Sequence, residues 1–388
     1  MKTIHARRII IGGVIVAALV ILTLLIFLAL LFPAGRAEAA YRFGRFRARP
    51  PVHIYRAAAA TPRGITPAEI KSAYRLPTTG GRGTIAIIDA YDAPSIEKDL
   101  AVFDAAYRLP ACTIKNGCLE KHRMASLIST NSGWALEMSL DVEWAHAIAP
   151  GAKILLVEAK TPSGQNLLDA IDYARKRKDV IAISMSWGGA EFSDEADYDG
   201  HFAASAGKVA FFASSGDGGT GVSWPASSPY VIGVGGTSLR FSPSGVVANE
   251  TAWAGSGGGV SAYEKQPAYQ AAYRIARAAG MRAVPDVAYN ADPASGFGVY
   301  MTSGTKRPKG AWYVVGGTSA GAPQWAAIQA LGRAVSLPAL YADKASSAAD
   351  SYFRDITSGA NGGCGYYCSA RRRYDYVTGL GAPQTVRF

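Results

Sequence analysis

Histidine is scarce in this chain of 388 residues. Five are present, and none of them follows His201. A serine nucleophile in the C-terminal half would therefore lack a histidine downstream of it to serve as general base. Charged residues are also few, at 18%, whereas apolar residues make up 49%. This balance excludes a largely disordered chain and predicts a globular protein with a full core.

Cysteine is limited to four residues in two close pairs, Cys112 with Cys118 and Cys364 with Cys368. Neither pair has the Cys-x-x-Cys spacing of many zinc sites. We therefore favour two local disulfides over a four-cysteine zinc site. Disulfides indicate an oxidising compartment outside the cytoplasm.

Basic residues outnumber acidic ones, 40 to 29, which gives a net charge of +11. Such an excess can indicate a nucleic acid partner, an anionic membrane surface or only solubility, and we favour solubility. A group of arginines lies between an apolar N-terminal segment and the globular part. At this place a lipid headgroup or a cell-wall polymer is a better candidate partner for the arginines than a nucleic acid. The arginines are Arg42, Arg45, Arg47 and Arg49. No nucleic acid partner is predicted.

The N-terminal part of the chain carries a candidate membrane segment. A basic stretch, residues 1–8, precedes residues 9–32, which contain no charged side chain. At ~1.5 Å of rise per residue, a helix over this run is long enough to span a bilayer. A secretory signal peptide is the alternative, with Ala37-Glu38-Ala39 as its cleavage site, but the apolar run is long for that role. We favour the uncleaved anchor.

Residues 33–64 are rich in Ala, Arg and Pro without sustained periodicity, which predicts a linker. From residue 65 onward, short β-branched runs alternate with stretches of helical spacing, as in parallel sheets buried on both faces. The strand-like runs are 84–88, 153–157, 180–184, 209–213 and 230–234, and the helix-like stretches are 96–107, 134–148 and 165–177. We predict one α/β domain over residues 65–388, with a doubly wound, mainly parallel sheet and helices on both faces.

A glycine-rich string, residues 316–323, places Ser319 just before the apolar stretch 325–331. This predicts a serine in a turn at a helix N-terminus, where backbone N–H groups favour developing negative charge. Capping of the helix by Ser319 is the alternative. The string also matches the Gly-x-Ser-x-Gly elbow of α/β-hydrolases, but those enzymes need a histidine after the serine. If Ser319 is a nucleophile, its base is not a histidine.

Glu137 and Asp141 are four residues apart, so on a helix their carboxyl groups share a face. Such a pair can hold one proton between its members, one carboxylate acting as base while the other orients it. A solvated acidic helix face is the alternative. The neighbouring apolar residues favour the functional interpretation; they are Leu136, Met138, Leu140, Val142 and Trp144.

A third string, residues 211–219, predicts a buried strand that ends in a tight turn presenting Asp217. An Asx-turn is the structural alternative. If Asp217 is buried, its raised pKa would keep it neutral, and the carboxylic acid could donate a hydrogen bond to an oxyanion.

Together these strings resemble the sedolisin, or serine-carboxyl peptidase, family, whose fold is subtilisin-like. The likeness covers residues 65–388. The Glu-x-x-x-Asp helix of the family matches Glu137 and Asp141, and its Gly-Asp turn matches Asp217. Its Ser-Gly-Thr-Ser-Ala-x-x-Pro motif matches residues 316–323, with a glycine in place of the first serine. Supporting strings are residues 65–70, 184–189 and 255–261.

The resemblance implies a serine-type endopeptidase. Ser319 would attack the peptide carbonyl while Glu137 takes its proton. Asp141 would orient Glu137, and Asp217 with backbone N–H groups would stabilise the oxyanion. These roles correspond to those in a Ser-His-Asp peptidase, with carboxylates in place of the imidazole. An acidic pH optimum follows, because Glu137 must be ionised while Asp217 keeps its proton.

Asp89 follows the strand-like run 84–88, where a subtilisin carries its triad aspartate. We interpret Asp89, with Trp187, as support for the site, and a turn role for Asp89 is the alternative.

The resemblance also implies one calcium site, with oxygen ligands of the kind that Ca²⁺ prefers. The ligands would be the carboxylates of Asp355 and Asp375 and the carbonyls of Ile356, Arg371 and Arg373. The family usually has glycine at the positions of Arg371 and Arg373. Cations beside a divalent ion are unfavourable unless their side chains point away.

Family members commonly carry a large N-terminal prodomain, and the predicted linker leaves no room for one before residue 65. We expect a monomer that acts on protein or peptide substrates outside the cytoplasm, either anchored by residues 9–32 or secreted. The alternative is a catalytically inactive, membrane-anchored binding module of the same fold. An esterase would need the missing histidine.

Overall fold

The computed structural model describes residues 43–203, 208–302, 310–332, 335–345 and 352–384. The chain forms two compact units, residues 1–46 and residues 47–388, and the second contains the helices and strands named below. Within the described residues, no helix has the length and apolar character needed to cross a membrane. The predicted basic stretch, residues 1–8, and the predicted apolar span, residues 9–32, lie outside the described residues.

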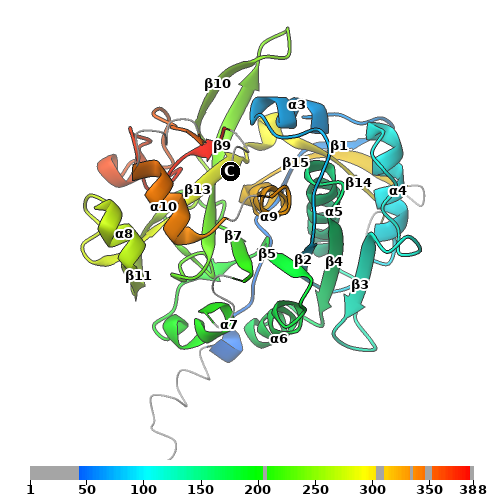
Figure 1. The fold of residues 1–388 in the computed structure, drawn as a ribbon, viewed down its shortest axis with the longest axis horizontal. Coiled ribbons are helices and arrows are strands. Elements are labelled where there is room, and N and C mark those ends of the chain that lie inside the picture. Colours follow the sequence, from blue (N-terminus) through cyan, green and yellow to red (C-terminus); the bar gives the residue numbers. More distant parts are fainter. Residues whose placement is uncertain (1–42, 204–207, 303–309, 333–334, 346–351, 385–388) are drawn as a thin grey trace, which may run out of the picture. The chain divides into compact units, whose positions relative to one another are not determined.

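The centre of the second unit is an eight-stranded sheet (Figure 1). Seven strands follow the order β10-β9-β7-β5-β2-β4-β3, and β13 pairs with β9. All of these pairs are parallel except the one between β10 and β9. The strands are β2 (Thr84–Ala90), β3 (Leu119–Arg123), β4 (Lys153–Ala159), β5 (Val180–Met185), β7 (Ala210–Ser214), β9 (Ile232–Phe241), β10 (Val247–Ala252) and β13 (Val287–Asn290). The predicted, mainly parallel sheet is confirmed.

Helices cover both faces of this sheet. On one face α5 (Ser132–Ile148) and α9 (Gly321–Ala330) pack on β2 and β5, and on the other α6 (Gly164–Arg175) packs on β2, β4 and β5 (Figure 1). The short apolar runs become strands because every residue of β2 is buried between these layers. The remaining helices are α3 (Pro67–Ala73), α4 (Ile96–Tyr107), α7 (Gly200–Ala203), α8 (Ala268–Tyr273) and α10 (Leu337–Ala345).

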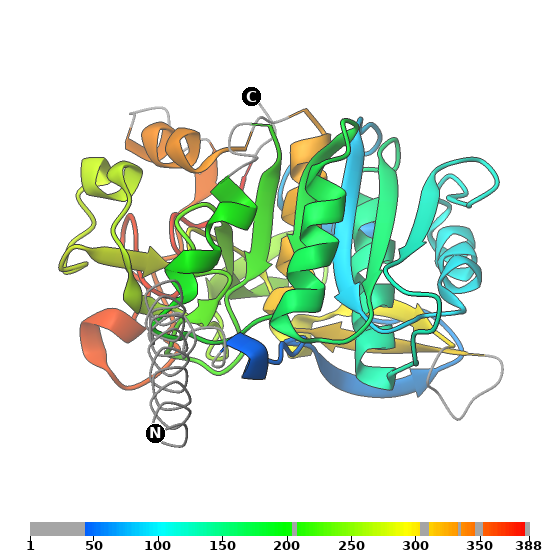
Figure 2. The same ribbon diagram turned by 90° about the horizontal axis from the view of Figure 1, so that it is seen from below.

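The described residues of this unit also form four smaller sheets. The largest has the antiparallel order β1-β15-β14 (Figure 2). Its strands are β1 (His53–Ala59), β14 (Phe297–Met301) and β15 (Ala311–Gly316), and the others are β6 (Gly189–Ala190) with β8 (Ser223–Trp224), β11 (Gly259–Lys265) with β12 (Met281–Val284), and β16 (Phe353–Arg354) with β17 (Ala382–Pro383). β1 lies in the segment that the sequence predicts as a linker, and the compact unit begins at Arg47.

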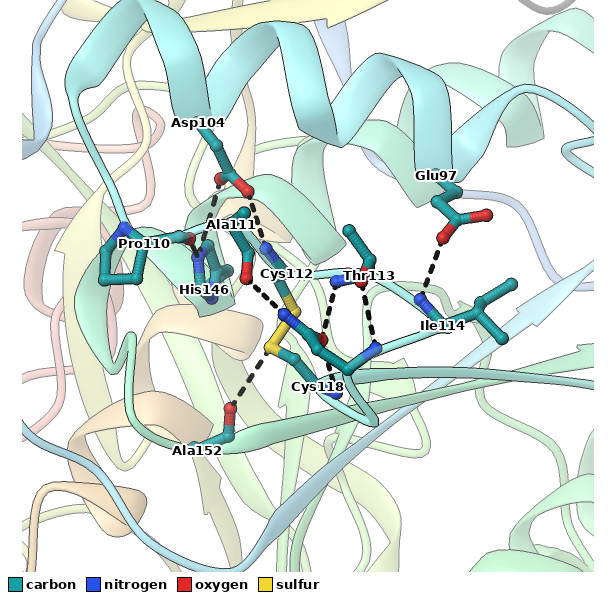
Figure 3. The surroundings of a disulfide bond; sticks show 11 residues. Glu97, Asp104, Pro110, Ala111, Cys112, Thr113, Ile114, Cys118, His146 and Ala152 are labelled. Atoms are coloured by element: carbon teal, nitrogen blue, oxygen red, sulfur yellow. Dashed lines mark hydrogen bonds and ion pairs between the residues drawn. A yellow bond between two sulfur atoms is a disulfide. The ribbon is translucent and has the colours of Figure 1, made fainter.

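Both cysteine pairs form disulfides, Cys112–Cys118 and Cys364–Cys368, as the sequence predicts. Figure 3 shows the first of them, where the N–H of Cys112 donates to a carboxylate oxygen of Asp104 (3.0 Å). Burial raises the pKa of Asp104 to about 7. Because all four sulfurs are consumed in disulfides, the four-cysteine zinc site is excluded.

Candidate active site

Three segments that are far apart in the sequence meet in the structure. Asp217 lies in the turn that follows β7, and Ser319 lies in a short 3-10 helix, η3 (Thr318–Ala320), which leads into α9. α5, which carries Glu137 and Asp141, packs against both η3 and α9. The structure therefore brings together the four residues that the sequence marks as catalytic candidates.

The turn before Ser319 depends on Gly317, whose φ of +131° is one that side chains disfavour. A Cβ there would lie 2.0 Å from the carbonyl oxygen of Pro51 and 2.5 Å from Oδ2 of Asp217. Ser319 is buried, and its hydroxyl makes no hydrogen bond of normal geometry with a described residue. Ala320 is the N-cap residue of α9, so Ser319 does not cap that helix and the capping alternative is wrong.

Glu137 and Asp141 lie one turn apart on α5. Asn131 caps the start of this helix with its side-chain oxygen, and every residue from Trp134 to Ile148 is buried. The alternative of a solvated acidic face is therefore wrong. Neither carboxylate makes a hydrogen bond of normal geometry with the described residues. The packing of α5 keeps both carboxyls fully buried.

Burial is the largest cause of the raised pKa values of this pair. It raises the pKa of Glu137 well above its ordinary value, and the charges of Asp141 and Asp89 add to the effect. Burial also raises the pKa of Asp141 to about 8, which the hydroxyl of Ser186 opposes. The Ser319 hydroxyl is close enough to lower the pKa of Glu137, although no hydrogen bond of normal geometry joins them. The pair thus retains protons into the neutral range, with Ser319 beside it.

Asp89 extends the group of buried carboxyls. It lies at the carboxyl end of β2, in register with Glu158 on β4. Burial raises the pKa of Asp89, and the charges of Asp141 and Glu158 raise it further. Burial raises the pKa of Glu158 to about 7, and Lys121, whose Nζ lies 3.1 Å from Oε1, opposes the shift. The sequence analysis missed Glu158, because its place beside Asp89 depends on the pairing of two strands.

The segment after β5 also contacts the site. The Ser186 hydroxyl donates to the backbone carbonyl of Ser319 (3.2 Å), and the indole N–H of Trp187 donates to the carbonyl of Ile88 (2.8 Å). Trp187, singled out from the sequence, thus ties this segment to β2 just before Asp89. The contact made by Ser186 was not foreseen.

Asp217 is held by hydrogen bonds across the site. Its Oδ1 accepts from the N–H and the hydroxyl of Thr318, both at 2.8 Å. The Gly216 N–H donates to the same hydroxyl (3.1 Å), and the N–H of Gly257 donates to the Gly216 carbonyl (2.7 Å). The partners of the Asp217 carboxylate, Thr318 and His53, therefore lie far from it along the chain, whereas in an Asx-turn the carboxylate bonds its own backbone two residues on. Burial raises the pKa of Asp217, opposed by His53 and Thr318.

His53 is a member of the site that the sequence analysis missed. Its Nε2 lies 3.0 Å from Oδ2 of Asp217, and its side chain is 54% exposed. The contact with Asp217 raises the pKa of His53 above its ordinary value, although partial burial opposes the shift. The ring lies edge-on to Trp253 at 6.4 Å. No motif marks this residue, because β1 was expected to be a linker.

The residues predicted to bind calcium lie close together. The N–H of Arg373 donates to a carboxylate oxygen of Asp355 (2.8 Å) and the N–H of Arg371 donates to Asp375 (3.2 Å), so segment 371–373 joins the two carboxylates. Arg373 has a φ of +66°, a conformation that glycine favours. The Arg371 guanidinium stacks on Tyr366, 4.4 Å from the ring centroid. The fifth predicted ligand is Ile356.

Asp375 limits the fit to calcium. Its two carboxylate oxygens accept four hydrogen bonds, from the N–H groups of Arg371, Val377 and Thr378 and from the Thr378 hydroxyl. A carboxylate offers about four lone-pair positions. Asp375 would have to release a hydrogen bond to ligate an ion, so the residues fit calcium only in part.

The chain is similar in sequence to proteins of known families. The subtilase family model matches residues 123–347, more than half of the chain. The chain belongs to the subtilase family. Two relatives of the chain bear out its resemblance to the sedolisin family. Kumamolisin from Bacillus sp. (strain MN-32) is 34% identical over 373 residues, which cover 86% of this chain and 64% of the relative. Sedolisin from Pseudomonas sp. (strain 101) is 30% identical over 366 residues, which cover 84% and 60%. The chain thus spans less than two thirds of the length of these relatives.

Solved structures agree with the subtilase assignment. Pseudomonas sedolisin, a serine-carboxyl proteinase complexed with two molecules of pseudo-iodotyrostatin, superposes with a TM-score of 0.71 at 27% identity over 84% of this chain and 97% of that one. Sphericase superposes with a TM-score of 0.52 at 19% identity, over 85% of this chain and 99% of that one, and supports the fold alone. The predicted subtilisin-like fold is confirmed.

Proposed function

We propose that this subtilase is a serine-type endopeptidase with Ser319, Glu137 and Asp141 as its triad and Asp217 in the oxyanion hole. The observation that carries the proposal is the buried Glu137–Asp141 pair beside the buried hydroxyl of Ser319, which is close enough to lower the pKa of Glu137. In peptidases with a Ser-His-Asp triad a histidine takes the role of base. The similarity to kumamolisin and sedolisin supports a peptidase that acts on protein or peptide substrates.

In the proposed reaction the Oγ of Ser319 attacks the peptide carbonyl carbon and its proton passes to Glu137. Glu137 later returns the proton to the leaving amine. Asp141 holds Glu137 in position and shares its proton. The negative charge that develops on the carbonyl oxygen is stabilised by hydrogen bonds from protonated Asp217 and from backbone N–H groups of the turn.

The proposal requires two protonation states at once. Asp217 must be neutral, so activity should fall as pH rises through its raised pKa. Glu137 must be ionised, although burial, and after it the charges of Asp141 and Asp89, raises its pKa. Once Asp141 binds a proton its charge no longer raises the pKa of Glu137, so the second proton binds the pair more weakly, while the effect of burial remains. The proposal therefore requires Asp217 to bind its proton at a higher pH than the pair binds its second one, and activity is expected between these two titrations, on the acid side.

The first test is hydrolysis of a denatured protein from about pH 2 to about pH 8. Activity on the acid side should disappear in Ser319→Ala. Ser139→Ala is the matched control, because Ser139 is a buried serine on α5 outside the triad. A folded wild-type protein without activity at any pH would favour the alternative, an inactive binding module. Activity that survives Ser319→Ala would exclude this nucleophile.

Calcium is proposed as a structural ion only. Asp355 and the carbonyls of Ile356, Arg371 and Arg373 would hold it, with Asp375 exchanging a hydrogen bond for the ion. A bound ion would raise the melting temperature, by an amount that grows with the logarithm of the free calcium concentration above Kd. We expect a chelator to lower the melting temperature of the wild type but not of Asp355→Ala. Equal melting of the wild type with and without chelator would exclude the site.

The two disulfides support a location outside the cytoplasm. Anchoring by residues 9–32 or secretion after their cleavage, and a monomeric state, remain part of the proposal. Fractionation of expressing cells, followed by N-terminal sequencing of the mature protein, would separate anchoring from secretion.

A further inference from the structure

A cavity of about 690 Å³ lies at the amino-terminal edge of the central sheet. Its wall includes Ala210 and Ile232, which are the first residues of β7 and β9. Asp217, by contrast, follows the carboxyl end of β7. This strand has five residues, which at ~3.3 Å per residue puts its two ends roughly 15 Å apart. The cavity is therefore separate from the candidate active site.

Helices bound the cavity beside these strands. α8 and α10 pack against each other, and residues of both helices line the cavity (Figure 1). Phe202 on α7 and Gln329 in the last turn of α9 also belong to its wall. The shape of the cavity thus depends on the packing of helices and strands.

The wall of the cavity is mainly apolar. Six of its apolar side chains are buried, namely Phe202, Val209, Phe211, Ile232, Val335 and Leu337. Polar groups beside them bond within the wall: the Tyr269 hydroxyl donates to the carbonyl of Pro229 (2.9 Å), and the side-chain oxygen of Gln329 accepts from the N–H of Val335. Ligand cavities in proteins have volumes of roughly 300–1,000 Å³ and mostly apolar walls. The cavity therefore suits a small ligand with an apolar body.

Two lysines give the cavity a positive charge. Lys208 precedes β7 and Lys265 is the last residue of β11, and both are exposed members of the wall. Neither forms an ion pair with a carboxylate of a described residue, and the Lys265 ammonium lies 3.8 Å from Sδ of Met281. No aspartate or glutamate is among the described residues that line the cavity. The two ammonium groups therefore favour a ligand that carries a negative charge.

We infer that this cavity binds a single-chain amphiphile with an anionic head, of the class of long-chain fatty acids. The alkyl chain would lie among the buried apolar side chains, and its removal from water would supply most of the affinity. Lysine stems can cover apolar surface while their ammonium groups stay in water, so the carboxylate would lie at Lys208 and Lys265. The inference does not depend on the proposed peptidase activity, because the two sites lie at opposite ends of β7.

The first test is titration calorimetry of the full chain with dodecanoate, below its micelle concentration and at about pH 7, where a carboxylate is ionised. Ala268→Trp adds an indole at an exposed position of α8 that lines the cavity. Ala272→Trp is the matched control, an exposed alanine on the same helix outside the wall.

We expect the wild type and Ala272→Trp to bind dodecanoate equally, and Ala268→Trp to bind it roughly tenfold more weakly or less, because the indole takes up the volume of the ligand. Attachment of dodecanoate to other apolar surfaces would be the same in all three proteins. Equal Kd values for the three proteins, or no binding by the wild type, would overturn the inference.

The second test concerns the anionic head. Dodecanol has the same alkyl chain without the charge, and the wild type should bind it roughly two- to tenfold more weakly than dodecanoate. Lys265→Gln should weaken the binding of dodecanoate by roughly two- to fivefold and leave that of dodecanol unchanged. Lys178→Gln is the control, an exposed lysine outside the wall of the cavity. Equal affinities for the two ligands in the wild type would overturn the choice of an anionic ligand.

A third measurement separates a free fatty acid from the acyl chain of a membrane lipid, which has the same chemistry. Association with vesicles of phosphatidylcholine and phosphatidylglycerol would be measured by sedimentation for the wild type and for Ala268→Trp. Equal association of the two proteins, together with weaker binding of dodecanoate by Ala268→Trp, would support a free ligand. Loss of vesicle association in Ala268→Trp would assign the cavity to a membrane lipid and overturn the inference.

Discussion

Two buried acidic groups of the site are held in opposite ways. The Glu137–Asp141 pair makes no hydrogen bond of normal geometry with described residues, and the packing of α5 keeps it fully buried. Asp217 accepts two hydrogen bonds from Thr318 and pairs with His53. Burial raises the pKa of all three carboxyls.

The difference suits the two proposed roles. A base must exchange a proton with Ser319, and a carboxylate already saturated by donors would be too weak a base for this. An oxyanion donor must stay in one place, since hydrogen-bond strength depends on geometry. Substitutions in the pair should therefore change the rate most, and substitutions at Asp217 should change the pH dependence most.

The largest effect is expected at the base. Glu137→Gln keeps the size of the side chain but cannot accept the proton, so kcat should fall by roughly 100- to 10,000-fold. Glu143→Gln is the matched control, a buried glutamate on the same helix whose carboxylate accepts from the N–H of Tyr300 (3.1 Å). Steady-state hydrolysis at the pH optimum measures both. Equal losses in the two variants would assign the effect to helix packing.

At Asp217 the two obvious substitutions should differ. Asp217→Ala removes the donor, and kcat should fall by roughly 100- to 1,000-fold. Asp217→Asn keeps a donor that does not titrate, so its loss should be smaller and the decline of activity toward neutral pH should disappear. A pH profile of kcat for each variant checks this. A decline that stays at the wild-type pH in Asp217→Asn would assign it to another group.

A third effect concerns stability. Gly317→Ala places a Cβ in contact with backbone at a positive φ, and we expect it to lower the free energy of unfolding by about 1–3 kcal/mol. Gly363→Ala is the control, because a Cβ there meets no heavy atom within 4 Å. Denaturant unfolding of both variants gives the comparison. Equal stabilities would mean that the turn relaxes without cost.

The smallest effect is expected at Asp89. Its negative charge raises the pKa of Glu137, so Asp89→Asn should lower that pKa and shift the acid side of the profile to lower pH. Because burial keeps Asp89 itself largely neutral in acid, the change in kcat should stay below roughly tenfold. A loss as large as that of Glu137→Gln would instead give Asp89 a direct role.

The sequence allowed the central sheet and the catalytic candidates to be predicted for a physical reason. Strands buried on both faces leave continuous apolar runs, and the run 84–88 accordingly predicted β2. Helical spacing of apolar residues over 96–107 predicted α4. The motifs lie at strand ends and helix starts, where local sequence determines the turn. The four candidates therefore needed no long-range information to be found.

The features that could not be predicted depend on the pairing of strands that lie far apart in the sequence. β1 joins β15 through its backbone, and Ile54, Tyr55 and Arg56 are exposed, so no apolar alternation marks the strand. His53, the first residue of β1, was missed for that reason. Glu158 was missed because the β2–β4 register alone places it beside Asp89.

The most direct test of the central claim is covalent labelling of the nucleophile at acidic pH. The wild type, Glu137→Gln and Glu143→Gln would be treated with a peptidyl fluorophosphonate, and the modified residue identified by mass spectrometry. We predict modification of Ser319, at least 100-fold slower in Glu137→Gln and unchanged in Glu143→Gln. Modification of another residue, or equal rates in all three proteins, would contradict a serine activated by carboxylates.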